Sequence, residues 1–100
     1  LKRRQSAEET VKFYREGHSI DQIMHMRQLA RSTIFAHLTE AIQNGEDLDL
    51  TLLVAPDKQI AIRAIIAEVG SERLMPIKEK LPEHFTYEEI RLVAAYYRRS

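Results

Sequence analysis

The side chains best suited to binding another molecule lie in the segment from Arg27 to Thr39. Arg31 can pair with a guanine or a phosphate, and Ser32 can donate a hydrogen bond to either partner. A helix that begins at Arg31 adds a partial positive charge that favours a phosphate. The alternative is that both residues are solvated members of a first helical turn. The side chains expected to face outward and to contact DNA are Arg27, Arg31, Ser32, Phe35, Ala36 and Thr39.

Phe35 has two interpretations. An exposed ring could contact a thymine methyl or stack on an unpaired base. A ring covered by a neighbouring helix would leave the binding surface partly masked and would favour a protein-interaction module. Burial is the favoured interpretation, because a large apolar ring is more often covered than exposed.

Two helices joined by a tight turn must position these side chains. Ser19 followed by Gln22 is a capping box that starts a short helix. The Arg27-Gln28-Leu29 segment breaks the helical period, which resumes at Arg31. Ile34, Leu38 and Ile42 then recur every four residues and predict one buried stripe, and Gly45 ends the helix. This is the helix-turn-helix pattern, whose second helix lies in a DNA major groove.

Four further helices are expected around this motif. Ser6 with Glu9 predicts a first helix ending near Gly17, and residues 46–50 could be a short extended segment. Residues 50–54 are expected to form a turn. The later helices are expected at 57–69, at 72–81 and, after a third capping box formed by Thr86 and Glu89, to the chain end. Tyr87, Ile90, Val93, Ala94 and Tyr97 are expected to form the inner face of the last helix.

The predicted fold is all-α. It comprises an N-terminal helix-turn-helix, winged-helix-like but with little or no wing, and a C-terminal three-helix unit packed with it as one domain. The predicted organisation is a linker end at 1–5, the helix-turn-helix unit at 6–45, a connector at 46–56 and the C-terminal unit at 57–100.

Composition limits the possible functions. The 100 residues have a formal net charge of +0 and no cysteine, which excludes disulfides and thiolate metal sites. Residues 1–40 carry seven basic and five acidic residues, whereas residues 41–100 carry eight and ten. Any nucleic-acid surface is therefore expected in the first part and to be weak. No apolar run is long enough for a membrane span, and a cytoplasmic location is expected. The start at Leu1 suggests a piece of a longer chain.

No catalytic or cofactor site is expected in this piece. His18, His25 and His37 are not spaced to share one helical turn, and nothing completes a metal site around them. His37 is expected to be a packed, hydrogen-bonded residue. The sequence has no glycine-rich phosphate loop and no nucleophile with an adjacent base. The chain alone is therefore not expected to be an enzyme.

Two stretches together resemble a known family. The first is Gly17-x-Ser19-Ile20-x-x-Ile23 with Arg31-Ser32-Thr33-Ile34-x-x-His37-Leu38, and the second is Leu74-x-Pro76-Ile77-Lys78 with Thr86-Tyr87-x-Glu89-Ile90-Arg91-Leu92-Val93. The pair is similar to the helix-turn-helix domain at the C-terminus of many bacterial RecQ-type ATP-dependent DNA helicases, over about residues 6 to 97.

This resemblance implies an accessory domain that helps the helicase to engage DNA during repair or recombination, with DNA and the rest of the helicase chain as partners. Two residues depart from the usual turn: Gln28 stands where a glycine is usual, and Ala30 where a capping serine is usual. Both weaken the turn. The alternatives are a protein-interaction module that docks on the helicase core or another partner, and a helix-turn-helix transcription regulator.

Overall fold

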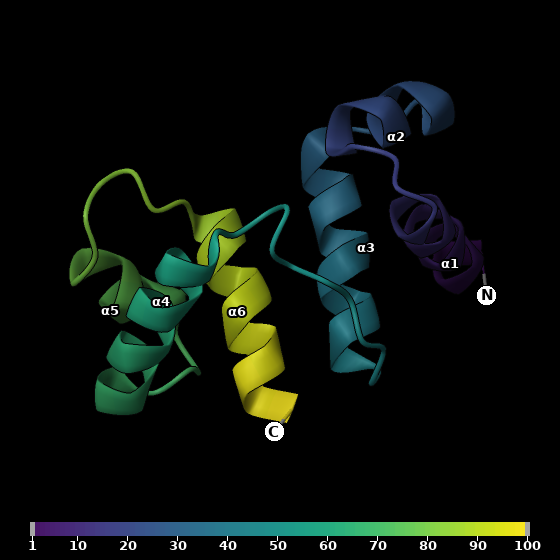
Figure 1. Cartoon of the computed structure of the whole chain (residues 1–100). Helices are drawn as coiled ribbons and strands as arrows, with labels where there is room; N and C mark the ends of the chain where they lie inside the picture. Colours follow the sequence, from purple (N-terminus) through teal and green to yellow (C-terminus); the bar gives the residue numbers. More distant parts are fainter. Residues whose placement is uncertain (1, 100) are drawn as a thin grey trace. The chain divides into compact units, whose positions relative to one another are not determined.

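The computed structural model describes residues 2–99, and the side chains of residues 6–99. Over this range the chain forms six α-helices and no strand, so the predicted all-α class is confirmed (Figure 1). The chain divides into two compact units, Leu1–Leu48 and Asp49–Ser100, called here the N-terminal and C-terminal units.

The N-terminal unit contains three mutually contacting helices, α1 (Lys2–Arg15), α2 (Ile20–Arg27) and α3 (Arg31–Gln43). Ile23, Ile34, Leu38 and Ile42 are each 0% exposed and form its core. The predicted stripe along α3 is therefore confirmed. It faces inward because residues four apart lie on one side of a helix.

The expected helix start at Ser6 is wrong, because α1 begins at Lys2. The Ser6–Glu9 pair lies inside the helix and does not cap it. Glu9 forms an ion pair with Arg27 (Oε2 to Nη2, 3.0 Å), and the Ser6 hydroxyl accepts a hydrogen bond from the same guanidinium. The spacing of Ser6 and Glu9 matches a capping box, but both side chains bind Arg27 of α2 instead.

The turn between α2 and α3 contains Gln28 and Ala30 at the two positions where the sequence departs from the usual turn. The Ser19 and Gln22 side chains form both bonds of the capping box that starts α2. Gln28 adopts left-handed backbone angles (φ 54°, ψ 47°), a conformation that suits glycine better. Ala30 precedes α3 without any side-chain cap. After α3 the chain turns at Gly45, whose φ is 96°.

The segment between α3 and α4 has no regular structure. Leu48 and Leu50 are buried, whereas Asp47 and Asp49 are exposed. Thr51 donates its hydroxyl (2.6 Å) and its main-chain N–H (3.0 Å) to the Asp49 carboxylate, and both bonds hold the pKa of that carboxyl below its ordinary value of 3.8.

The C-terminal unit contains α4 (Pro56–Val69), α5 (Leu74–Glu79) and α6 (Tyr87–Arg99), each in contact with the other two. Pro56 occupies the start of α4, where its missing N–H costs nothing. The helix expected at 72–81 is shorter than predicted. Arg73 has extended backbone angles (φ −126°, ψ 130°), so α5 cannot begin before Leu74.

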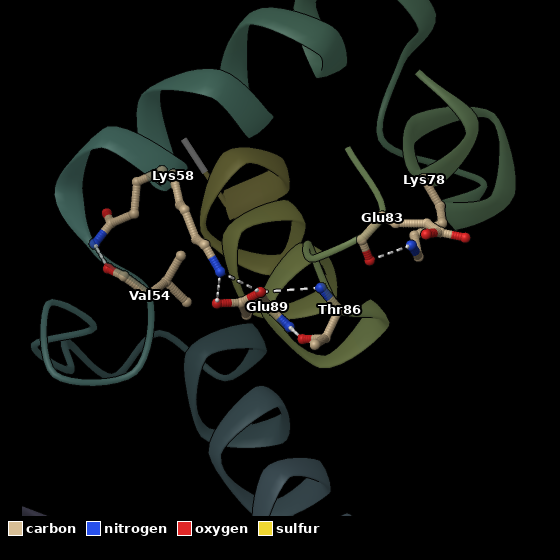
Figure 2. Close-up of polar contacts among 7 residues, drawn as sticks. Val54, Lys58, Lys78, Glu83, Thr86 and Glu89 are labelled. Carbon is tan, nitrogen blue, oxygen red and sulfur yellow. Dashed lines mark hydrogen bonds and ion pairs between the residues drawn. The ribbon is translucent and has the colours of Figure 1, made fainter. Parts of the chain in front are cut away.

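Helix α6 starts with the predicted capping box. Glu89 N donates to the Thr86 hydroxyl (3.1 Å), and Thr86 N donates to the Glu89 carboxylate (2.9 Å) (Figure 2). The same carboxylate accepts hydrogen bonds from Lys58 Nζ of α4 at 3.0 and 3.2 Å (Figure 2). Glu89 therefore begins α6 and also joins it to α4.

The predicted inner face of α6 is partly wrong. Ile90, Val93 and Ala94 are buried as expected, but Tyr87 and Tyr97 are 43% and 41% exposed. The structure buries Leu92 and Ala95 as well, so the buried arc of α6 is wider than the stripe read from the sequence. Tyr87 and Tyr97 lie close to the two ends of the helix, where fewer neighbours cover a side chain.

Candidate nucleic-acid interface

The exposed N-terminal half of α3 presents Arg31, Ser32 and Ala36. Ser32 and Ala36 lie on the side of α3 opposite the buried stripe that contains Ile34 and Leu38, whereas Arg31 lies on the side of that stripe and is exposed in the first turn of the helix. The first turn of a helix in this position is the part that reaches base edges and phosphates. Arg31 and Ser32 supply hydrogen-bond donors there, and Ala36 leaves room for close approach of a partner.

Phe35 and Thr39 do not face outward as predicted. They are 5% and 6% exposed, so the burial favoured for Phe35 is confirmed and the outward orientation of both is wrong. The Thr39 hydroxyl turns back onto its own helix and donates to the Phe35 carbonyl oxygen (2.9 Å). The Arg31 guanidinium carbon lies 4.8 Å from the centre of the Phe35 ring, so that cation–π contact covers part of the ring and orients Arg31.

Arg27 was also placed wrongly on the outward surface. Its side chain is only 12% exposed, and it donates to the Thr10 hydroxyl (2.6 Å) and to the main-chain oxygen of Ser6. With the ion pair to Glu9, these bonds tie α2 to α1. Arg27 therefore holds the N-terminal unit together.

A buried polar chain joins all three helices of this unit. Thr10 of α1 is 0% exposed, and its hydroxyl lies 2.7 Å from Nδ1 of His37 on α3. The same oxygen accepts a hydrogen bond from Arg27 of α2, so the Thr10 hydroxyl contacts both of the other helices. The expectation that His37 is packed and hydrogen-bonded is confirmed.

The available positive charge near α3 is small. Arg15 forms an ion pair with Glu46 (2.9 Å), and Arg27 forms one with Glu9. Both pairs place a carboxylate beside a cation that could otherwise meet a phosphate. The surface around Arg31 can therefore neutralise few phosphates.

Gln28 is an exposed residue of the turn that sequence reasoning did not place in the interface. Its side-chain amide donates to the carbonyl oxygen of His25, which lies in the last turn of α2 (2.9 Å). The sequence could have indicated this role, because Gln28 lies in the turn just before Arg31 and Ser32, the first exposed residues of α3. Its polar side chain extends the candidate interface beyond Arg31 and Ser32.

Two other kinds of site are absent from the described residues. No three His, Cys, Asp or Glu side chains within residues 2–99 converge where they could hold a metal ion. None of the helices in that range is long and apolar enough to cross a membrane.

Comparison with known proteins gives one match. A family model described as a helix-turn-helix domain matches residues 6–94, which includes parts of both units. No curated protein and no solved structure matches the chain.

Proposed function

The chain belongs to this helix-turn-helix domain family, and we propose on that basis that it binds DNA through the first turns of α3. The observation that carries the proposal is the exposure of Arg31, Ser32 and Ala36 beside a turn of the expected geometry. The proposed interface comprises Gln28, Arg31, Ser32 and Ala36. Phe35 acts on it indirectly, through its contact with the Arg31 guanidinium.

Binding through this surface is weak and only mildly salt-dependent. Arg31 is the one cation among the four interface residues, and the N-terminal unit pairs Arg15 and Arg27 internally. We expect micromolar or poorer affinity for duplex DNA and a log–log salt slope of about −2 to −4.

A titration of labelled duplex, forked and single-stranded DNA, followed by fluorescence anisotropy, tests the interface. Arg31→Ala should weaken duplex binding and make the salt slope shallower by about one if Arg31 contacts a phosphate. Lys12→Ala is the matched control, because Lys12 is an exposed cation of the same unit on α1. Equal effects of the two substitutions, or nanomolar binding with a steep slope, would contradict this interface.

The finer proposal is an accessory role in a RecQ-like ATP-dependent DNA helicase. It is supported by the two sequence motifs around Ser19 and Thr86, whose capping boxes both form in the structure. In such a helicase, Arg31→Ala should slow unwinding of a forked duplex and leave ATP hydrolysis without DNA unchanged. The isolated chain should hydrolyse no ATP. Unwinding at the unaltered rate would refute the accessory role of this surface.

A protein-interaction module is the second candidate, and the outer face of α4 favours it. Pro56, Ile60, Ala64 and Ala67 are exposed at helical spacing, and Ile60 is 69% exposed. Contiguous apolar residues on a surface often mark a protein contact. Ile60→Lys should then abolish co-sedimentation with a RecQ-type ATPase core and leave DNA binding intact. Unchanged co-sedimentation would exclude this face.

A further inference from the structure

The fully exposed residues of α6 are all arginines or tyrosines. Over residues 87–99, the exposed residues are Tyr87, Arg91, Tyr97, Arg98 and Arg99, and all others are buried or half-buried. Both acids of the helix, Glu88 and Glu89, are in the half-buried class. The fully exposed positions of α6 are therefore all cationic or aromatic.

Three of these residues form a row along the helix. Tyr87, Arg91 and Arg98 are separated by four and seven residues, which places them within about 40° of one another at about 100° per residue. The two arginines lie about 10.5 Å apart along the axis, at 1.5 Å per residue. We call Tyr87, Arg91 and Arg98 the α6 row.

The surroundings of the α6 row strengthen its positive character. The Glu89 carboxylate accepts hydrogen bonds from Lys58 and from the Thr86 N–H, so its charge is already paired (Figure 2). Lys78 Nζ of α5 lies 5.9 Å from the centre of the Tyr87 ring. The same nitrogen donates to the Glu83 main-chain oxygen (3.3 Å) (Figure 2). The aromatic end of the row therefore also has a cation beside it.

The stability of the fold does not account for this row. Arg98 lies in the last turn, where a cation complements the helix dipole, but Arg91 lies in the middle of the helix, where that effect has faded. Neither arginine forms an ion pair or hydrogen bond with a residue in the described range 2–99. Tyr87 leaves 43% of its surface exposed.

We propose that the α6 row binds a single nucleic-acid strand, as a second contact surface that belongs to the C-terminal unit. Arg91 and Arg98 bind phosphates of the strand, since guanidinium groups match phosphate oxygens in geometry and charge. Tyr87 stacks on an unpaired base, because a base face is accessible only when it is not stacked in a duplex. Neither oligoglutamate nor a phosphatidylserine membrane has a flat ring for Tyr87 to stack on.

Anisotropy titration of the whole chain with a labelled oligothymidylate of about 15 nucleotides tests the proposal. The double variant Arg91→Gln/Arg98→Gln should weaken binding at least tenfold and make the salt slope shallower by about 1.4, at about 0.7 per phosphate contact on a single strand. The matched control is Arg63→Gln/Arg73→Gln, which removes two exposed arginines of the same unit that lie outside α6. The control should bind as the unaltered chain does.

The stacking contact has its own pair of variants. Tyr87→Leu should weaken oligothymidylate binding about fivefold or more, and Tyr87→Phe should retain it because the ring face remains. Equal losses for the row and control arginines, or equal affinity of Tyr87→Leu and Tyr87→Phe, would overturn the proposal. So would equally tight binding of oligoglutamate or of phosphatidylserine vesicles.

The same titrations separate this surface from the one on α3. Arg31→Ala should leave oligothymidylate binding intact, and the row double variant should leave duplex binding intact. If Arg31→Ala removes strand binding, the α6 row is not an independent site. If Arg31→Ala leaves duplex binding unchanged while the row variants weaken strand binding, the α3 proposal fails and the α6 proposal stands.

Discussion

Replacing Thr10 with valine should destabilise the N-terminal unit by about 2–3 kcal/mol. The substitution preserves the shape of a side chain that is 0% exposed but removes the oxygen that lies 2.6 Å from Arg27 Nη1 and 2.7 Å from His37 Nδ1. A hydrogen bond to a charged group contributes about 1.5–3 kcal/mol, and an unsatisfied buried polar group costs about 1–3 kcal/mol. The expected loss of stability lies near the lower end of the sum of these two ranges, because Arg27 keeps its bonds to Ser6 and Glu9.

The assay is urea unfolding followed by the amide NMR signals of α2 and α3, so that the N-terminal unit is observed by itself. With a slope of about 1–2 kcal/mol/M, the midpoint should fall by about 1–3 M. Thr39→Val is the matched control. Thr39 is also buried, at 6% exposed, but its hydroxyl donates only to a main-chain oxygen of its own helix, so the loss should be small. A Thr10→Val midpoint that matches the Thr39→Val midpoint would refute the idea that this chain of bonds holds the three helices together.

Three further predictions concern local features. Ile34→Asp places a charge at a position that is 0% exposed and should cost several kcal/mol, whereas Ala36→Asp on the exposed side should change the melting temperature little; similar melting temperatures would contradict the assigned faces of α3. Gln28→Gly should stabilise the unit by up to about 1 kcal/mol in urea unfolding, because φ at this residue is 54°, and any loss of stability would show that its side-chain bond matters more. The pKa of the Asp49 carboxyl should be below 3.8 when it is measured by NMR, and Thr51→Ala should raise it. Because folding lowers this pKa, the associated stability is present above the pKa of the unfolded chain and is lost as the pH falls through the pKa of the folded state. An unchanged titration in Thr51→Ala would exclude the Thr51 hydroxyl as the cause.

Two capping boxes could be predicted from the sequence because they close within three residues. Ser19 with Gln22, and Thr86 with Glu89, each satisfy main-chain N–H groups of their own helix start, whatever packs against that helix. The Ile34 stripe was equally predictable, because helical periodicity alone places residues four apart on one side. The sequence by itself therefore determined that six segments are helical, where the turn motif lies and which two of its residues are unusual.

The roles of the polar and aromatic side chains depended on tertiary structure. Ser6 and Glu9 have the same spacing as a capping box, yet they bind Arg27, which comes from a different helix. The bond between Thr10 and His37 spans 27 residues, so no local pattern reveals it. Burial of Phe35 depends in the same way on where other side chains lie.

The same distinction applies to the candidate surfaces. Sequence periodicity identified the exposed start of α3 but could not tell that Arg27 is engaged internally or that Tyr87 is exposed. A side chain is available to a partner only if no other helix of the folded chain covers it or pairs with it. That outcome is set by long-range packing, whereas helix type and helix ends are set by hydrogen bonds between near neighbours in the chain.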